Sequence, residues 1–428
     1  MKKLWLMLLV IITLFVASAF SDTLTVWFLG YNSVYSPIAT VVSNFEKAYP
    51  NIHVDISYKP VATVGAAPAL ITAIQAGNPP DVVVDFDRFT LPTWAAEGYL
   101  MPLDKYIKEN NVSLNAFIPY AIQSSMYDGK IYGLPMEVSA RVMMYSIPLL
   151  KKFGIPFPSA STPLTWSQYK QYLIKTTTID PQTGFYKTLG CDYLGDEEQW
   201  FSTWAVLAGV NFYDETTRKF TFDSPAGLQV MDMYKWLSDE FPPTKVSGFM
   251  GAFPGVNVAF AEGKLAFFLS GAWNLSWFDS IGFKYGIDYG LAPLPVPTAG
   301  MPIATWSGGH ATVIPVGSKN ISDAFKFAEY MSIGPGAVYY DKASANIPAV
   351  KSEAMIMYKD DPAMLYFLKQ ILNYGHLRLP TVPTKAQLWD TLASAVSKVE
   401  YGKLTPQAAL EWAQQQSQKD LDQFYAIH

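Results

Sequence analysis

The sequence predicts an α/β protein of two domains, and three observations lead to this fold class. Short apolar segments with strand periodicity alternate along the chain with segments of helical periodicity, as in sheets that are flanked by helices. Removal of a 19-residue leader from the 428 residues leaves 409, too many for one hydrophobic core and enough for two. No low-complexity linker separates two halves, so we expect the chain to cross between the domains more than once.

The N-terminus has the organisation of a secretory signal peptide. Lys2 and Lys3 precede an apolar run over 4–16, and the small residues 17–19 supply a cleavage site after Ala19. No cysteine lies near this site, so we do not expect an acylated lipoprotein. We therefore expect a periplasmic or otherwise extracytoplasmic mature protein.

Composition argues against several classes of function. The formal net charge is −5, and it becomes −7 without the two leader lysines, which argues against a nucleic-acid partner. Cys191 is the single cysteine, so an internal disulfide is excluded. The histidines show no metal-ligand spacing, and no cofactor motif is present; they are His53, His310, His376 and His428.

The individual elements follow from apolar spacing and from breakers. Strands are predicted at 24–28, 52–58, 81–85, 130–135 and 141–145, with an extended proline-rich run at 292–297. Helices are predicted at 37–49, 66–75, 198–208, 225–238, 324–332, 388–399 and 406–424. A further helix opens at 164–166, where Thr165 is suited to cap it.

Residues 260–273 form the most informative segment. They predict the end of an amphipathic helix, a Gly-Lys turn, a short buried strand and then Trp273. The small residues 270–272 do little to cover this indole. An exposed aromatic face at a strand end suits stacking on a flat ligand, whereas an ordinary core tryptophan is the alternative interpretation.

The chain resembles the extracellular solute-binding proteins of ABC importers, in the branch of the maltose- and maltodextrin-binding proteins. Each matching segment is short, but together they span the mature chain in the family's order. They are 24–27 (LTVW), 45–52 (FEKAYPNI), 77–82 (GNPPDV), 127–135 (YDGKIYGLP), 164–166 (LTW), 260–264 (FAEGK), 289–295 (YGLAPLP) and 402–406 (GKLTP).

This resemblance implies a type II periplasmic-binding-protein fold, with two α/β lobes, each a mostly parallel sheet flanked by helices, and a ligand cleft between them. It places chain crossings near 137–139, 297–303 and 343–349. Lobe one would comprise 20–137 and 302–345, and lobe two 138–301 and 346–428. The implied partners are a small carbohydrate and the permease subunits of an ABC transporter, and we expect a monomer.

The resemblance also implies ligand contacts at particular positions. Trp273 matches the family's stacking tryptophan, and Asp87 with Arg88 matches a pair that reaches sugar hydroxyls. Tyr31 and Asn32 replace a charged pair in the relatives, which leaves the identity of the ligand open.

For several other candidates, contact with ligand and a structural role stay open. Glu137 and Arg141 bracket the first crossing in an apolar stretch, so either the cleft solvates them or they are paired. The remaining candidates are tryptophans, a turn glycine and a cation: Trp200, Trp306, Gly308, Trp389 and Arg378.

The function that these residues predict is a non-enzymatic sugar receptor of an ABC transporter. An alternative ligand is an inositol, a phosphorylated polyol or another small solute, with Arg88, Arg141 and Arg378 as anion donors. A remote alternative is an exported glycoside hydrolase that uses carboxylates such as Asp85, Asp87 and Glu137. No serine-nucleophile elbow, P-loop or zinc pattern is present in the sequence.

Overall fold

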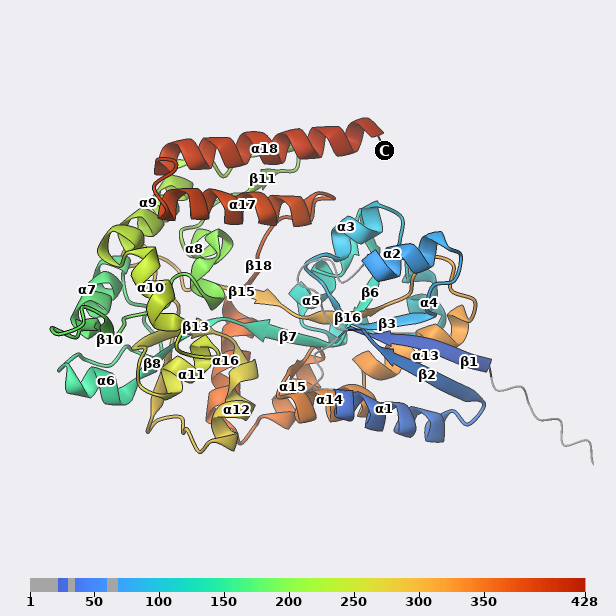
Figure 1. The fold of residues 1–428 in the computed structure, drawn as a ribbon. Helices are drawn as coiled ribbons and strands as arrows, with labels where there is room; N and C mark the ends of the chain where they lie inside the picture. Colours follow the sequence, from blue (N-terminus) through green and yellow to red (C-terminus); the bar gives the residue numbers. More distant parts are fainter. Residues whose placement is uncertain (1–21, 30–34, 60–67, 428) are drawn as a thin grey trace, which may run out of the picture.

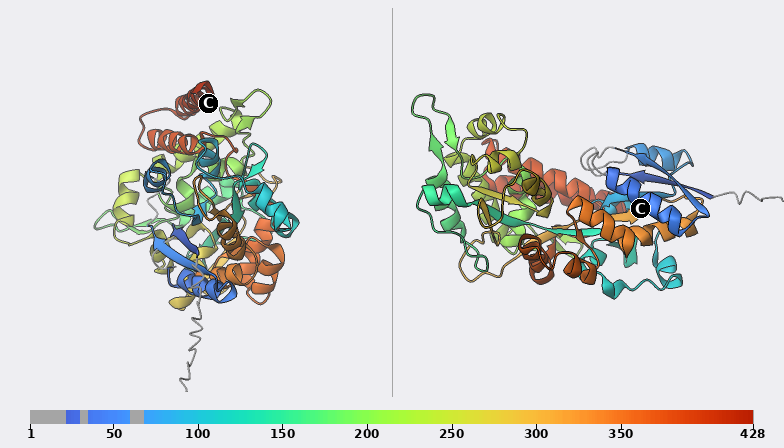
Figure 2. Two further views of the ribbon diagram at one scale, coloured as in Figure 1. Left: turned by 90° about the vertical axis from the view of Figure 1, so that its right-hand side faces the viewer. Right: turned by 90° about the horizontal axis from the view of Figure 1, so that it is seen from below.

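The computed structural model describes residues 22–29, 35–59 and 68–427. The predicted signal peptide at 1–19 and the candidates Tyr31 and Asn32 lie outside the described residues. Two α/β lobes lie end to end, and helices cover their sheets (Figures 1 and 2). Within the described ranges, we find no helix with the length and apolar character needed to cross a membrane.

The sheet of the first lobe has the strand order β2-β1-β3-β16-β6. β1 (Asp22–Phe28) pairs in parallel with both β2 (Ile52–Tyr58) and β3 (Val82–Asp87), at the positions that the sequence predicts. β16 (His310–Val313) is reversed, because it pairs antiparallel with both β3 and β6 (Gly133–Pro135). The apolar strands are therefore buried between helical layers, as expected for a sheet of this kind.

Helices of both halves of the sequence cover this sheet. In α1 (Tyr35–Ala48), Ile38, Val41 and Phe45 are fully buried, which is the helical spacing seen in the sequence. The other elements here are α2 (Pro68–Gln75), α3 (Leu91–Ala96), α4 (Asp104–Glu109), α5 (Pro119–Gln123), α13 (Ile321–Ser332), α14 (Pro335–Ser344) and the strand pair β4 (Met126–Tyr127) and β5 (Lys130–Ile131).

The sheet of the second lobe is centred on β8 (Val142–Ser146). β8 pairs antiparallel with β13 (Phe267–Ser270) on one side and with β14 (Tyr289–Ala292) on the other. This three-stranded sheet thus differs from the mostly parallel sheet that was expected. The physical reason is common to both lobes: the reversed strand, β8 here and β16 in the first lobe, is the one that continues from a strand between the lobes.

The rest of the second lobe is largely helical. Thr165 caps α7 in a capping box with Gln168, as its sequence context predicts. The helices are α6 (Ile147–Lys152), α7 (Trp166–Thr176), α8 (Phe201–Leu207), α9 (Pro225–Glu240), α10 (Pro243–Met250), α11 (Val256–Ala261), α12 (Leu275–Ser280), α15 (Lys351–Met357), α16 (Pro362–Tyr374), α17 (Lys385–Glu400) and α18 (Pro406–Ile427). Short strand pairs are β9 (Thr178–Ile179) with β10 (Tyr186–Thr188), and β11 (Tyr213–Asp214) with β12 (Lys219–Phe220).

A four-stranded sheet joins the lobes, in the order β17-β7-β15-β18. β7 (Glu137–Ala140) pairs antiparallel with β15 (Thr305–Gly308) and with β17 (Ile347–Pro348), and β15 pairs in parallel with β18 (Gly375–Leu377). We call these four strands the hinge sheet. Two of its strands start within the predicted crossings, and β15 starts just after the second one. The lobe boundaries themselves stay a prediction.

Asp81 fixes the start of β3 against two other segments. Its Oδ2 accepts hydrogen bonds from Thr25 N and Oγ1, at 2.9 and 2.8 Å. Its Oδ1 accepts from Ser318 Oγ and from the backbone N–H groups of Lys319 and Asn320, at 3.1–3.2 Å. Burial raises the pKa of Asp81, but these hydrogen bonds lower the pKa more, so it lies below its usual value.

We expect Asp81→Ala to lower the free energy of unfolding by about 2–4 kcal/mol, because it leaves several buried donors without an acceptor. The contribution of a carboxyl with a lowered pKa is present above the unfolded-state pKa of about 4 and is lost in more acidic solution. Urea unfolding at pH 7 and at pH 3.5 should therefore show a smaller difference from wild type at pH 3.5. Asp55→Ala, at an exposed position of β2, is the control. Equal effects of the two substitutions on the free energy of unfolding would contradict the structural role assigned to Asp81.

Candidate functional site

The centre of the hinge region is a buried guanidinium. Arg88 is 1% exposed, and it follows β3 directly. Its Nη1 donates to the carbonyl of Ala121 at 3.1 Å, and its Nη2 donates to those of Glu137 and Gly308 at 2.9 and 2.7 Å. Tyr120 Oη donates to the same Gly308 carbonyl at 2.7 Å. Arg88 therefore holds β3, α5, β7 and β15 together, and it has little surface left for a ligand.

Gly309 has to be glycine for this arrangement. Its φ of 137° lies in a region that favours glycine. A Cβ atom at this position would lie 2.3 Å from Arg88 Nη2 and 2.3 Å from the carbonyl oxygen of Glu137. Gly309 thus permits the close approach of the Arg88 guanidinium to the strand. Gly308 contributes its carbonyl, and we call Arg88 and the residues that share its hydrogen bonds, Ala121, Glu137, Gly308 and Tyr120, the frame.

Two carboxylates hold one imidazole next to the frame. Glu137 Oε1 lies 2.8 Å from His310 Nδ1, and both Glu137 oxygens accept from the backbone N–H of His310, at 2.8 and 3.0 Å. Asp85 Oδ1 lies 3.5 Å from the same Nδ1. Asp85 has φ 62° inside β3, opposite an irregularity in β16 between Ala311 and Val313. Such a bulge redirects side chains and is common beside functional sites.

The charges of this group are mutually dependent. Burial lowers the pKa of His310, but the carboxylates of Asp85 and Glu137 outweigh burial and raise it to about 10. Burial raises the pKa of Asp85 to about 6, although His310 opposes this. Burial also acts to raise the pKa of Glu137, but the charge and hydrogen bond of His310 lower it below its usual value. At neutral pH, His310 is thus an imidazolium between two carboxylates, and its side chain is still 37% exposed.

Three tryptophans and two arginines form a continuous stack along the hinge sheet and the adjoining second lobe. The Arg141 guanidinium carbon lies 4.6 Å from the ring centroid of Trp273 and 3.3 Å from that of Trp306. The Arg378 guanidinium carbon lies 3.8 Å from the Trp306 centroid and 3.9 Å from that of Trp389. We call these five residues the cation–π stack. Such contacts contribute about 0.5–2 kcal/mol each, and more where water is excluded.

Hydroxyl groups of neighbouring strands and helices fix the inner members of the stack. These hydrogen bonds are Arg141 Nη1 to Ser139 Oγ at 2.6 Å, Arg378 Nε to Ser202 Oγ at 2.6 Å, and Trp306 Nε1 to Thr203 Oγ1 at 3.0 Å. Trp306 is 4% exposed and Trp389 and Arg378 are 9% exposed. The guanidinium groups of Arg141 and Arg378 both lie over the Trp306 ring, so this ring has almost no surface open to a ligand.

The far end of the stack touches the first lobe. Trp389 on α17 packs on Trp200 at 4.2 Å between ring centroids, and on Phe89 at 5.0 Å. Trp200 precedes α8 and is half-buried, whereas Trp204, one turn later, is fully buried and donates to the carbonyl of Glu198. Phe89 directly follows Asp87 and Arg88. The stack therefore extends from Trp273, across the hinge strand β15, to an aromatic contact between the lobes.

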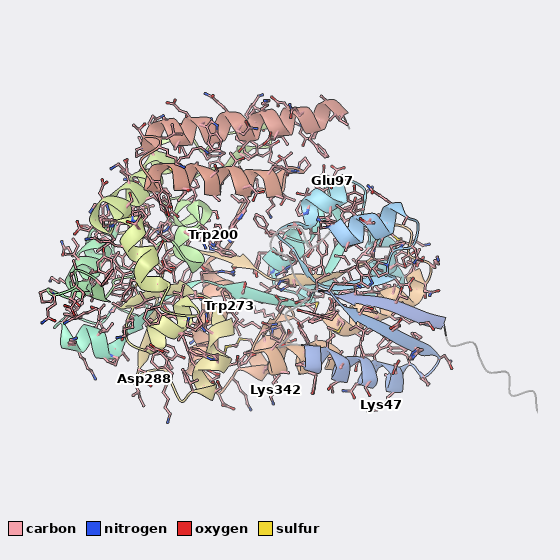
Figure 3. The ribbon with its side chains drawn as sticks, viewed as in Figure 1. Lys47, Glu97, Trp200, Trp273, Asp288 and Lys342 are labelled. Carbon is pink, nitrogen blue, oxygen red and sulfur yellow. The ribbon has the colours of Figure 1, made fainter. Side chains whose placement is uncertain are left out.

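Trp273 differs from the other members because it is 39% exposed. It is the only exposed tryptophan in the described part of the chain. Figure 3 shows it on the side of the second lobe that faces the first. Its ring folds back over Gly271, where a Cβ atom would lie 1.8–2.3 Å from three ring atoms. Glycine at position 271 is thus required for the close approach of the Trp273 ring to the backbone.

The structure therefore divides the predicted contacts into two groups. Asp87 and Trp273 are exposed, while Arg141 and Trp200 are half-buried, so these four retain accessible surface. Buried or engaged in the frame and stack are Arg88, Glu137, Gly308, Trp306, Arg378 and Trp389. The position of His310 was not predicted, since nothing but the preceding glycine pair marks it in the sequence. Among the described residues, no group of His, Cys, Asp and Glu could hold a metal ion.

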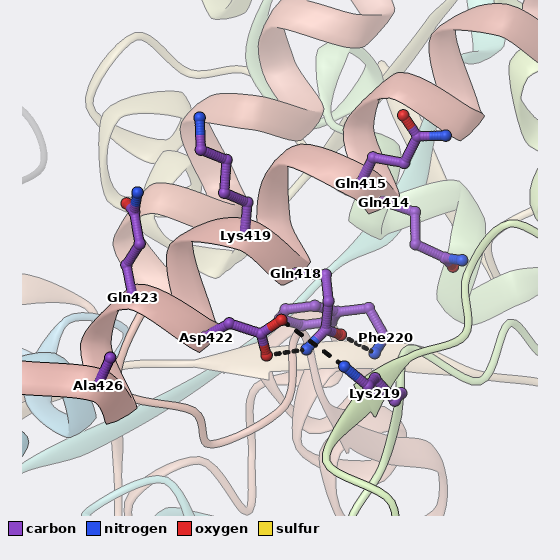
Figure 4. A pocket seen from close by; sticks show the side chains of 9 residues that line it. All are labelled: Lys219, Phe220, Gln414, Gln415, Gln418, Lys419, Asp422, Gln423 and Ala426. Atoms are coloured by element: carbon purple, nitrogen blue, oxygen red, sulfur yellow. Dashed lines mark hydrogen bonds and ion pairs between the residues drawn. The ribbon is translucent and has the colours of Figure 1, made fainter.

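Two surface hollows lie away from these residues. One, of about 640 Å³, lies between α18 and β12, and Figure 4 shows that Asp422 at its edge is paired with Gln418 and Lys219. Asp422 accepts from Gln418 at 2.7 Å and lies 3.6 Å from Lys219 Nζ. The other, of about 670 Å³, lies beside β10 and α10. Neither contains a residue of the stack or of the frame.

Comparison with known proteins identifies a protein family that this chain matches. The sequence profile of bacterial extracellular solute-binding proteins matches residues 40–365. The galactooligosaccharide-binding protein of Bacillus subtilis (strain 168) is 26% identical over 392 residues, which cover 88% of this chain and 84% of that protein. The maltooligosaccharide ABC transporter solute-binding lipoprotein of Streptococcus pneumoniae (strain ATCC BAA-255 / R6) is 26% identical over 377 residues, 84% of this chain and 79% of that protein.

Solved structures agree. CpMnBP1 with mannotriose bound has a TM-score of 0.79 and 25% sequence identity, and the match covers 92% of this chain and 100% of that chain. The sugar-binding protein MalE of Xanthomonas citri has a TM-score of 0.76 at 22% identity, over 95% of this chain and 99% of that one. These similarities confirm the predicted resemblance and the two-lobed fold.

We expect His310→Gln to lower the free energy of unfolding at pH 6.5 by about 1–3 kcal/mol, because it removes a charged partner of Glu137 while solvent screens part of the effect. A histidine whose pKa is raised from 6.5 to about 10 contributes stability that is complete below pH 6.5 and is lost as the pH rises through 10. The difference between wild type and variant should therefore shrink from pH 6.5 to pH 10 in denaturant titrations.

The exposed His53 on β2 supplies the matched control, His53→Gln. An NMR titration gives an independent measurement, in which the His310 ring should stay protonated at pH 8. A neutral His310 ring at that pH would contradict the assignment of an imidazolium.

Proposed function

We propose that this chain, which belongs to the family of bacterial extracellular solute-binding proteins, is a sugar receptor of an ABC transporter outside the cytoplasm. It captures a mono-, di- or oligosaccharide between its lobes and delivers it to the permease. Relatives described as binding galactooligosaccharides and maltooligosaccharides support this, as does the bound mannotriose in a structural neighbour. The observation that carries the proposal is the cation–π stack, which ends in the exposed indole of Trp273.

The exposed groups have the chemistry that saccharides require. A pyranose ring presents a C–H face that packs on an aromatic ring, and Trp273 offers such a ring. Its hydroxyls need donors and acceptors, which the Arg141 guanidinium and the exposed Asp87 carboxylate supply. His310 adds a charged N–H donor from the first lobe, through its Nε2 atom. The contacts thus come from both lobes.

The buried candidates have a supporting role in this proposal. Arg88, Glu137 and Gly308 hold the strands of the hinge sheet in register, and Trp306 with Arg378 and Trp389 keeps Arg141 and Trp273 in position. Groups whose rotamers are fixed by packing lose little entropy when a ligand binds.

Closure of the lobes would couple binding to transport. A ligand shifts an open–closed equilibrium only through contacts that differ between the two states. Contacts from Asp87 and His310 on one lobe and from Trp273 and Arg141 on the other meet this condition. A closed receptor then presents a surface of both lobes to the permease, which is how we expect the transporter to distinguish it from the empty form.

Isothermal titration calorimetry against galacto-, malto- and manno-oligosaccharides, their monosaccharides, inositols and sugar phosphates tests the proposal. Small-angle scattering before and after ligand addition measures closure. We expect binding to one neutral or acidic saccharide class. The radius of gyration of the protein should be smaller with this ligand than without it. Failure to bind any saccharide would overturn the proposal, and binding of inositol or phosphorylated polyols alone would change the ligand. Release of reducing ends from the oligosaccharides would indicate a hydrolase instead.

We expect Trp273→Ala to weaken saccharide binding by about 1–3 kcal/mol, roughly 5- to 150-fold, because it removes the exposed aromatic face. The fold should persist, since the indole is 39% exposed. Titration calorimetry measures the affinity and thermal unfolding the fold. Phe185→Ala, which removes a 70% exposed ring from another part of this lobe, should leave the affinity unchanged.

Gly271→Ala tests the position of the indole without removing it. The added methyl group would overlap the Trp273 ring, so the ring must move, and we expect an affinity loss approaching that of Trp273→Ala. Gly248→Ala on α10 is the control, because a methyl group there meets no atom within 4 Å. Wild-type affinity in Gly271→Ala would show that the observed ring position is not the binding position.

A further inference from the structure

A further charged residue, Lys385, lies beside the end of the cation–π stack that is remote from Trp273. Lys385 is the first residue of α17 and is only 3% exposed. Its Nζ lies 4.8 Å from the ring centroid of Phe89, the residue of the first lobe that also contacts Trp389. Lys385 thus lies where α17 approaches the first lobe, near α3 (Figure 1).

The Lys385 ammonium lacks the partners that a buried charge normally has. In the described part of the chain, no hydrogen bond or ion pair joins its Nζ to another group. The charged groups that act on it are Asp87 from the first lobe, and Arg378 and Arg88, which have the same sign. Burial lowers the pKa of Lys385 to about 8, while Asp87 raises it and the two arginines lower it further. A lysine in these surroundings is costly for the empty protein.

The start of α17 adds further positive potential and a second polar group without a partner. The helix has 16 residues, so its first turn carries the partial positive charge of the helix dipole. Thr384, its N-cap residue, is 4% exposed, and its Oγ1 has no hydrogen-bond partner. An ammonium, a hydroxyl and a helix N-terminus at one place favour an anion.

We propose that the saccharide bound between the lobes carries a carboxylate, as a uronic acid does, and that Lys385 binds this carboxylate at the start of α17. The inference rests on the proposed sugar receptor and narrows its ligand to an acidic saccharide. One ammonium balances one negative charge. A phosphate dianion fits less well, because Asp87 is near.

The experiment compares pairs of saccharides that differ only at C6. We choose digalactoside with digalacturonate, mannobiose with dimannuronate, and the corresponding glucose pair, each measured by titration calorimetry at pH 6.5 and low salt. Wild type should bind the acidic member of at least one pair 10-fold or more tightly. Lys385→Met should abolish this preference and keep the affinity for the neutral member within about 3-fold, because Met retains the packing on Phe89.

The matched control is Lys398→Met on the same helix. Lys398 Nζ also lies over an aromatic ring, 3.7 Å from the Trp412 centroid, but away from the stack. This variant should retain the preference for the acidic member. Thermal unfolding without ligand gives a second measurement, in which Lys385→Met should be at least as stable as wild type, because a buried charge is removed.

The outcomes separate this inference from the function on which it rests. Equal affinity of wild type for both members of every pair, or an unchanged preference in Lys385→Met, overturns the acidic ligand and leaves the sugar receptor intact. A preference for sugar phosphates over uronates changes the acid group and also overturns the proposal as stated. No binding to any pair contradicts the sugar receptor itself. In wild type, the preference should decline as the pH rises through 8 and as salt increases.

Discussion

The hydrogen bonds of Arg88 determine where the two lobes meet. A guanidinium that is 1% exposed needs acceptors, and it finds them in the carbonyls of Ala121, Glu137 and Gly308. These come from three segments, of which the most distant in the sequence lies 220 residues from Arg88. Because carbonyls of both β7 and β15 are held, the side chains that leave these strands are held too. Glu137 then meets His310 on one side, and Arg141 meets Trp306 on the other.

The same two strands explain the reversed strand in each sheet. β7 leads into β8, which enters the second lobe against the direction of β13 and β14. β15 leads into β16, which enters the first lobe against the direction of β3. Each core is therefore completed by a strand that starts in the hinge sheet. A rotation of one lobe would be transmitted along two strands whose far ends are embedded in cores, so the change in dihedral angles would concentrate between them.

The fold was largely predictable because its signals are local. The spacing of Ile38, Val41 and Phe45 indicates α1 without knowledge of any other segment. Trp273 was also predictable, since its exposure follows from the small residues that precede it. These features depend on neighbours in sequence.

The division between exposed candidates and those buried in contact with other residues was not predictable, because distant partners decide it. Arg88 resembles a ligand contact until Gly308 supplies its acceptor, and Trp306 resembles one until Thr203 fixes its indole, 103 residues away. The same holds for His310, whose charge depends on Asp85 and Glu137. Its own sequence context contains no sign of either carboxylate.

The charges of the site are balanced in different ways, and the differences distinguish structure from function. Arg88 is balanced by carbonyls, Glu137 by an imidazolium, and Arg141 by aromatic faces. In each case most of the charge is compensated within the protein, although the Nε atom of Arg88 has no hydrogen-bond partner among the described residues. Lys385 is the exception, since it is as buried as Arg88 and Glu137 but has only an aromatic face and the charge of Asp87, without an ion pair among the described residues. A protein that retains such a destabilising group beside a contact between its lobes gains nothing from it in the empty state, so the compensation has to come from what the lobes enclose.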